Sequence, residues 1–290
     1  MSATSYHPPS FRERLYRNRW HVLKNTLLLA FASIAIFIPF WMVLVNSAKP
    51  IGEANQLGIG LPQEWALIEN YTTVLEEGTM GRGFINSVIV VVPSIIGIVL
   101  FGSMAAWVFA RTQSPRISFL YYLSIAGILI PPAVVASVRV LRTFEELGPQ
   151  IQLILFYMGV YTSFAIFLVT GFVKTIPIEL EEAARIDGAG PFMIFFRIIL
   201  PMLKPIIITA AFIMLLFMWN DFFYAFFFVG GAGNRTLVLG LFSFISGFFQ
   251  QIRWNLVFAS VVIVSLPLIF VFALAQRWIV SGLLGATVDK

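Results

Sequence analysis

Six long stretches of this 290-residue chain carry almost no charge, and they constrain its fold more than any other feature. Five uncharged runs cover 25–48, 83–110, 117–138, 147–173 and 254–276, and a sixth, 205–234, is interrupted only by Asp221. Each is long enough for a helix that crosses a bilayer, which needs about 20 residues. Inside lipid a helix satisfies every backbone N–H and C=O within its own segment. The runs therefore predict an all-α integral membrane protein with six transmembrane helices.

Composition supports this class and excludes others. Hydrophobic residues make up 59% of the chain and charged residues 11%, whereas soluble domains carry about 25% charged residues. The net charge of +5 comes from bases that cluster at the ends of apolar runs, which indicates membrane topology and not nucleic-acid binding. With 0 cysteines the chain has no disulfide, thiol nucleophile or thiolate metal site. His7 and His21 suggest no metal site either.

The charged segments between the runs predict the topology. Residues 1–24 form a basic segment that favours the cytoplasmic side, with Arg12, Arg14, Arg17, Arg19 and Lys24. The run 25–48 is too long for a signal peptide, whose apolar core spans about 7–15 residues, so we expect a retained first transmembrane helix. The loop 49–82 is rich in acids and suits the outer side. Six helices then place both termini in the cytoplasm, with 278–290 as a cytoplasmic tail.

A further apolar stretch, 236–252, is short and contains Gly240 and Gly247. We expect it to be a re-entrant or interfacial segment on the outer side. If it crossed the membrane, the C-terminus would lie outside. The excess of Lys and Arg in the segments assigned to the inner side favours six helices.

Residues 175–203 form a polar loop between the fourth and fifth runs. Pro177 is tolerated in a first helical turn, and the three acids that follow it favour a helix N-terminus, where the macrodipole is positive. Gly188 breaks that helix, and Pro191 suits the first position of another. The loop is therefore predicted to hold two short helices around Gly188.

Each short helix carries its own apolar face. The first face is small and consists of Leu180, Ala183 and Ala184. The second is expected to combine Phe192, Phe195, Phe196 and Ile199. A solvated loop with acids near helix starts is the alternative interpretation. An alanine stripe exposed in a charged loop stabilises nothing in water, however, and it allows a partner surface to approach closely.

The spacing Glu182-Ala183-Ala184-x3-Gly188-x9-Ile198-x-Leu200-Pro201 resembles the EAA motif of binding-protein-dependent ABC importer permeases. In that family the motif marks the loop that docks onto the ATPase subunit. Other stretches resemble the carbohydrate-importer branch, the MalG-like permeases: Glu69-Asn70-Tyr71, Asn86-Ser87, Ala105-Ala106-Trp107-x-x-Ala110-Arg111, Trp219-Asn220-Asp221-Phe222 and Thr236-Leu237-x-Leu239-Gly240-Leu241. Pro149-Gln150 and the tail after Gly285 depart from the family pattern.

The resemblance implies a type I ABC importer permease, with a MetI-like core over 80–277 that contains the coupling loop 175–203. Such a chain is a transport subunit and not an enzyme. Its implied partners are a second homologous permease, an ABC ATPase dimer, an extracytoplasmic solute-binding protein and the lipid of a prokaryotic cytoplasmic membrane. ATP and Mg belong to the ATPase, so the chain itself is expected to bind no cofactor. The implied ATPase-coupling residues are Glu181, Glu182, Ala183, Ala184, Arg185, Asp187, Gly188, Ala189, Leu200 and Pro201.

Trp219, Asn220 and Asp221 are the candidates for a substrate path. Asp221 is the only acid far inside an apolar run, where an ionisable group lines an aqueous path, pairs with a base or snorkels to the interface. Asn220 and Trp219 suit a sugar by hydrogen bonding and ring stacking. An interfacial aromatic belt explains the tryptophan equally well.

The cargo and the mechanism keep alternatives open. A sugar or oligosaccharide is the expected cargo, and a polyol, glycerol-phosphate or another solute is the first alternative. An ion-coupled carrier or channel that works alone is the second. Catalysis finds no support, because the glycine-rich residues 230–236 lack the lysine of a phosphate-binding loop. No cluster of serine, histidine and acid suggests a membrane hydrolase.

Overall fold

A computed structural model describes residues 11–144, 146–231, 233–245 and 252–285, and every regular element in these ranges is helical. The helices are α1 (Phe11–Asn46), α2 (Ile51–Ala54), α3 (Leu67–Glu77), α4 (Met80–Arg111), α5 (Pro115–Ala126), α6 (Val134–Arg142), α7 (Pro149–Val173), α8 (Glu179–Ile186), α9 (Pro191–Ile194), a π-helical turn (Phe195–Ile199), α10 (Leu200–Met202), α11 (Lys204–Trp219), α12 (Phe223–Val229), α13 (Leu237–Phe242) and α14 (Trp254–Gly285). For the described residues, the all-α prediction is confirmed.

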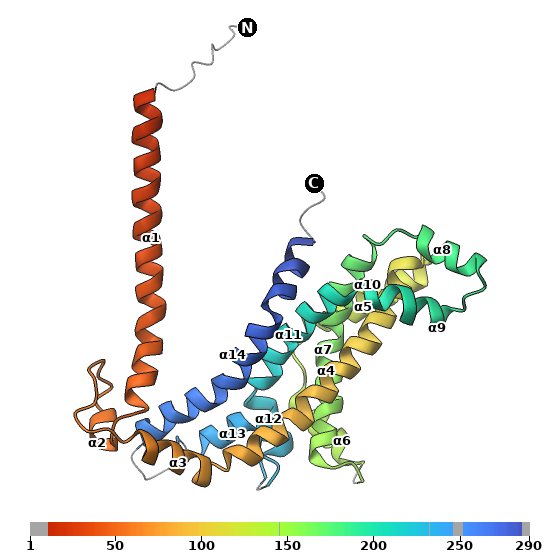
Figure 1. Cartoon of the computed structure of the whole chain (residues 1–290). Helices are drawn as coiled ribbons and strands as arrows, with labels where there is room; N and C mark the ends of the chain where they lie inside the picture. The colour runs from red at the N-terminus through yellow and green to blue at the C-terminus, as the bar shows by residue number, and fades with distance from the viewer. Residues whose placement is uncertain (1–10, 145, 232, 246–251, 286–290) are drawn as a thin grey trace. The chain divides into compact units, whose positions relative to one another are not determined.

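The chain divides into two compact units. The first comprises Met1–Tyr71 and Arg253–Val262, and the second comprises Thr72–Ile252 and Ile263–Lys290. The second unit therefore holds α4 to α13 (Figure 1). It contains both the polar loop and the candidate path residues.

Four described helical segments are long and apolar enough to cross a membrane: Trp20–Ser47, Met80–Arg111, Pro149–Val173 and Trp254–Gln276. A fifth candidate is a bent pair, Pro191–Met202 with Lys204–Trp219, whose two parts differ in direction by 75°. The third expected span, 117–138, is not one helix, because α5 ends and α6 begins within it. Six transmembrane helices therefore remain a prediction.

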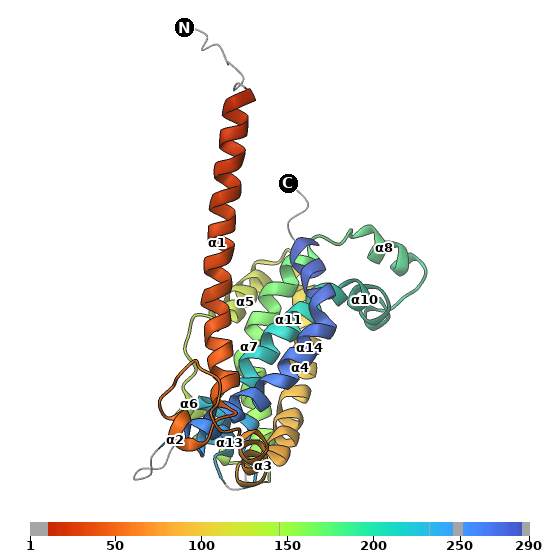
Figure 2. The ribbon, with the colours of Figure 1, turned by 60° about the vertical axis from the view of Figure 1, so that its left-hand side comes forward.

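Two consecutive prolines explain the break in the third run. Pro131 and Pro132 have no N–H to donate, and their rings clash with a preceding helical turn. A residue before a proline is also pushed toward extended backbone. The stretch 127–133 therefore leaves the helix, and a coil joins α5 to α6 (Figure 2).

The second unit is built around α4 and α7, which run in the same direction and pack along much of their length. Small residues allow the close approach: a Cβ on Gly102 would lie 2.9 Å from the Cβ of Ala165. The buried residues of this core include Val90, Ile98, Leu153, Tyr157, Ala210 and Met214. Figure 1 shows α8 and α9 at the end of α4 that carries Arg111, with α6, α12 and α13 at its other end.

Polar contacts close the end of this unit where α4 begins. Asn86 Nδ2 donates to the carbonyl oxygens of Gly233 and Arg235, each at 3.0 Å. Gln150 Nε2 donates to Asn86 Oδ1 at 3.0 Å, and Ser87 Oγ accepts the first N–H of α13 at 2.9 Å. The Asn86-Ser87 pair thus joins α4 to α7 and α13. Gln150, a departure from the family pattern, takes part in it.

The expected loop 49–82 and the expected re-entrant or interfacial stretch 236–252 both contain helices. The loop 49–82 includes α2 and α3, and the stretch 236–252 begins with α13. Residues 246–251 lie outside the described part of the chain. The re-entrant or interfacial character of 236–252 therefore remains a prediction.

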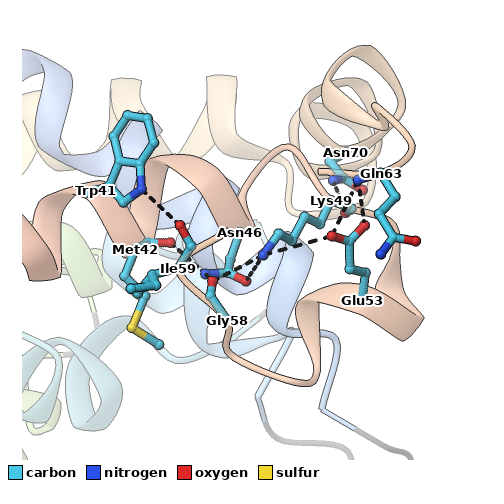
Figure 3. A network of polar contacts seen from close by, with 9 residues as sticks. All are labelled: Trp41, Met42, Asn46, Lys49, Glu53, Gly58, Ile59, Gln63 and Asn70. Atoms are coloured by element: carbon cyan, nitrogen blue, oxygen red, sulfur yellow. Dashed lines mark hydrogen bonds and ion pairs between the residues drawn. The ribbon is translucent and has the colours of Figure 1, made fainter. Parts of the chain in front are cut away.

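In the first unit, a buried lysine organises the chain after α1. Lys49 is 2% exposed, and its Nζ donates to the carbonyl oxygen of Gly58 at 3.0 Å and to Asn46 Oδ1 at 3.3 Å (Figure 3). Glu53 Oε1 lies 4.0 Å away. A buried ammonium group needs such partners, so these contacts hold the following segment against the end of α1.

Asn70, within the Glu69-Asn70-Tyr71 stretch, secures the same region. Its Nδ2 donates to the carbonyl oxygens of Ser47 at 2.9 Å and Lys49 at 2.8 Å. Its Oδ1 accepts Asn255 Nδ2 from the start of α14 at 2.7 Å. An amide both donates and accepts, which gives this asparagine a structural role in the first unit.

Candidate functional site

The polar loop between α7 and α11 folds as two short helices around a glycine, as predicted. Gly188 has a φ of +83°, a left-handed conformation that costs other residues about 1–2 kcal/mol. A Cβ at this position would meet no atom within 4 Å. The N–H of Ala189 bonds the carbonyl of Ala184 at 2.9 Å and closes α8. Backbone conformation, and not lack of space, thus requires glycine here.

Glu181 anchors α8 to the end of α4. The residue is 0% exposed, and its Oε1 accepts Arg111 Nε at 2.7 Å while its Oε2 accepts Trp107 Nε1 at 3.1 Å. Arg111 Nη2 also donates to the carbonyl of Ile176 at 2.7 Å. Arg185 Nη2 is a more distant and largely exposed partner at 3.6 Å. We call the contacts of Glu181 with Arg111 and Trp107 the latch.

The latch corrects one expectation from the sequence. Glu181 was expected to contact the ATPase, but its buried carboxylate faces inward. Ala184, three residues later, is half-buried and packs against the buried cluster that includes Ala106 and Val169. Residues three apart share a helix face, so this face of α8 belongs to the interior. The latch also joins two motif stretches 70 residues apart in the chain.

The opposite face of α8 is open. The expected coupling residues that are exposed in and just after this helix are Glu182, Ala183, Arg185, Asp187 and Gly188. Ile186, which the sequence reasoning omitted, is 87% exposed. The sequence does contain a sign of this exposure, because Ile186 is a large apolar residue that lies off the Leu180-Ala183-Ala184 stripe.

The apolar face expected on the second helix is wrong. Phe195 and Ile199 are buried, whereas Phe192 is 68% exposed and Phe196 is 46% exposed. The π-helical turn over Phe195–Ile199 has i→i+5 bonds and so departs from the α-helical period. The assumed spacing therefore did not apply.

The remaining expected coupling residues lie beside this segment. Ala189 and Leu200 are half-buried and pack against the core that also contains Phe195. Pro201 is exposed in the first turn of α10. Ala189 and Leu200 therefore contribute to the packing of the loop, and Pro201 lies in α10, outside the open face of α8.

The structure separates the three candidate path residues. Trp219 is 5% exposed, its Nε1 donates to the carbonyl of Val264 in α14 at 3.1 Å, and its ring lies edge-on to Phe84. These contacts cover most of the indole and leave little of it for a sugar to stack on. Asn220 is exposed, and its Nδ2 donates to the carbonyl of Leu216 at 2.9 Å.

Asp221 has structural partners. Its carboxylate accepts Tyr157 Oη at 2.7 Å and the backbone N–H groups of Ala225 at 2.9 Å and Tyr224 at 3.2 Å. The last two bonds satisfy first-turn donors of α12 and place negative charge at the positive end of that helix. Asp221 therefore joins α7 to the start of α12.

The open face of α8 has the chemistry of a binding surface. Glu182 and Asp187 offer charge-assisted contacts, which are stronger than neutral hydrogen bonds, and the largely exposed Arg185 lies beside them at the edge that meets Glu181. Across the described ranges, no three His, Asp or Glu side chains gather closely enough to hold a metal ion. The geometry fits docking of a partner protein.

Residues 25–284 match the family model of the binding-protein-dependent transport system inner membrane component. The melibiose/raffinose/stachyose import permease protein MelC of Bacillus subtilis (strain 168) is 34% identical over 263 residues, or 89% of this chain and 93% of MelC. The probable starch degradation products transport system permease protein AmyC of Thermoanaerobacterium thermosulfurigenes is 34% identical over 276 residues, or 93% of this chain and 98% of AmyC.

The fold also resembles a solved structure. A chain from the crystal structure of a bacterial ABC transporter involved in the import of the acidic polysaccharide alginate superimposes with a TM-score of 0.77. The two chains are 18% identical, and the similarity covers 94% of this chain and 99% of the other. The long family match and the two relatives agree with it. This chain belongs to the family of binding-protein-dependent transport system inner membrane components.

Proposed function

We propose that this chain is one of two homologous permease subunits of an ATP-driven importer for a sugar or oligosaccharide. Its relatives support the cargo class, because they are named for import of melibiose, raffinose and stachyose, of starch degradation products and of diacetylchitobiose. The family description supports delivery by a separate binding protein at an inner membrane. Both termini then lie in the cytoplasm.

The observation that carries the proposal is the two-sided character of α8. Its inner face is fixed to α4 through Glu181, while Glu182 and Ala183 on its outer face are exposed. A force on the outer face therefore reaches α4, which packs along α7. This geometry suits a coupling helix between an ATPase and the transmembrane helices.

In this mechanism a separate ATPase dimer binds ATP and Mg²⁺ and docks on the open face of α8. Glu182 makes a charge-assisted contact worth about 1.5–3 kcal/mol, and Ala183 permits close approach. Gly188 sets the angle between α8 and α9. The chain itself performs no catalysis and moves its helices in response to the ATPase.

Reconstitution tests this function. The chain is assembled in proteoliposomes with its cognate permease, ATPase and binding protein, and uptake of melibiose, raffinose, diacetylchitobiose, maltodextrin, sorbitol and glycerol 3-phosphate is measured. We expect accumulation of a sugar only with ATP inside and binding protein outside. Accumulation of sorbitol or glycerol 3-phosphate alone would refute the sugar assignment. Uptake driven by an ion gradient without ATP would support the ion-coupled alternative.

Two variants test the docking role of α8. Glu182→Lys reverses the outward charge, and Gly188→Pro removes the left-handed turn. Both are expected to abolish coupled uptake while the protein remains inserted in the membrane. Arg116→Glu is the control, because it reverses the charge of an exposed side chain in the first turn of α5, outside α8. Wild-type uptake in Glu182→Lys would remove the docking role.

A further inference from the structure

The non-helical stretch 127–133 lies at the middle depth of a transmembrane helix. Gly127 is packed against Ser163, because a Cβ at Gly127 would come within 2.6 Å of Ser163 Oγ. Ser163 lies near the centre of α7, one of the helices long and apolar enough to cross the membrane. The stretch is therefore placed within the hydrocarbon layer and not at its surface.

The backbone of this stretch is poorly satisfied. Among the described residues, no hydrogen bond reaches the carbonyl oxygens of 127–132. The first turn of α6 also has no side-chain cap. Irregular backbone at membrane depth does not face lipid, and it is found only where it is buried in protein or lines a water-filled cavity. These carbonyl groups therefore need a donor from protein, water or a ligand.

A cavity of about 650 Å³ adjoins the stretch. Its walls include residues 130–133, α6 around Ser137, and α7 around Phe156 and Gly159. The volume is within the range of about 300–1,000 Å³ for small-molecule sites, which combine apolar walls with a few polar groups. Here the polar groups are the Ser137 hydroxyl and the backbone carbonyl oxygens of Gly127, Ile130, Pro131 and Pro132.

We propose that this cavity is part of the sugar path, with the carbonyl oxygens of its wall residues Gly127, Ile130, Pro131 and Pro132 accepting hydrogen bonds from substrate hydroxyls. The inference rests on the proposed cargo class. A sugar supplies many hydroxyl donors, which match a row of acceptors with no N–H groups at Pro131 and Pro132. Its C–H faces suit the apolar wall around Phe156.

Cysteine accessibility tests the proposal directly, because the wild-type chain contains 0 cysteines. Ile130→Cys and Ser137→Cys place a thiol on the cavity wall. Leu129→Cys is the matched control, since Leu129 is the neighbouring residue, is 84% exposed, and is not part of that wall. Each variant is assembled with its partner subunits in membrane vesicles and treated with a charged, membrane-impermeant methanethiosulfonate.

We expect the two wall cysteines to react at least about tenfold faster than Leu129→Cys. Saturating melibiose, or the best-transported sugar of the uptake panel, delivered by the binding protein should slow their labelling at least about threefold. No reaction at the wall would show that lipid or the second permease covers the stretch, which overturns the proposal. Labelling without sugar protection, or equal labelling of the control, also overturns it.

Two measurements keep the result interpretable. Uptake by the cysteine-free wild type is recorded first, so that a failure of the proposed function is seen separately from a failure of the path. Each cysteine variant must retain uptake. If a wall variant does not assemble, Ala136→Cys on the same wall replaces it, and the same two outcomes decide.

Discussion

Removal of the Arg111 side chain tests whether the latch holds α8 in place. Arg111→Ala deletes two hydrogen bonds of 2.7 Å, one to Glu181 Oε1 and one to the carbonyl of Ile176. The buried Glu181 then keeps Trp107 and the largely exposed Arg185. Removal of one partner of a buried ion pair costs about 3–5 kcal/mol. We expect this loss in the free energy that holds α8 against α4.

The loss should appear as opening of α8, because this helix has 8 residues and so short a helix is marginal by itself. A change of about 3–5 kcal/mol corresponds to roughly 10²- to 10³-fold or more in the opening equilibrium. Glu181→Gln can keep an acceptor for Arg111, but it loses the charge and turns an NH2 group toward the Trp107 N–H, so its expected cost is smaller, about 1.5–3 kcal/mol. The double variant Arg111→Ala/Glu181→Ala should lose less stability than its two single variants lose together, because it buries no unpaired charge.

Hydrogen exchange over 179–186, together with sugar taken up per ATP hydrolysed, measures these effects in the reconstituted transporter. Arg116→Ala is the control, since Arg116 is an exposed arginine in the first turn of α5. We expect fast exchange and poor coupling in Arg111→Ala and wild-type behaviour in Arg116→Ala. Equal exchange in both variants, or strict additivity in the double variant, would refute the reasoning.

Three further substitutions test other parts of the site. Gly188→Ala should destabilise the loop by about 1–2 kcal/mol because of its φ of +83°, whereas Gly190→Ala, at a φ of −74°, should stay within about 0.5 kcal/mol. Equal effects on exchange would contradict the conformational argument. Asn86→Ala removes three hydrogen bonds and should cost about 1.5–4 kcal/mol, seen as a lower thermal midpoint in detergent. Asp221→Ala should cost about 1–2 kcal/mol through the lost contacts at α12, with an unchanged KM for sugar. A raised KM for sugar at unchanged stability would indicate that Asp221 contacts the substrate.

The polar loop shows how far local sequence rules reach. Pro177, Gly188 and Pro191 have strong conformational preferences of their own, so the helix–glycine–helix arrangement could be predicted. The orientation of α8 could not. Glu181 and Glu182 are adjacent acids, and which of the two is buried depends on Arg111 and Trp107, which lie far away in the chain.

The candidate path residues show the same limit. The sequence groups Trp219, Asn220 and Asp221 because Asp221 is an acid inside an apolar run and its two neighbours suit a sugar by ring stacking and hydrogen bonding. Consecutive residues at a helix end point in different directions, and the structure buries the first, exposes the second and bonds the third to α7 and α12. Their separate roles depend on packing partners that adjacency in the sequence does not reveal.

The structure of the third apolar run, 117–138, could be predicted only in part. Its composition suits a transmembrane helix, and Pro131 with Pro132 indicates a kink or an end. Local preferences do not reveal how many residues leave the helix, or that Gly127 lies against Ser163 of α7. Both outcomes depend on the packing of α5 and α6 against α7.

The sequence by itself determined the membrane class, the helical content and the glycine-centred polar loop. These properties follow from hydropathy and from the conformational preferences of single residues, which act locally. Only the tertiary structure decided that Glu181 faces inward, that Trp219 is buried and that an unwound stretch borders a cavity. Burial and hydrogen bonding depend on which distant segments meet, and that is a property of the packed chain.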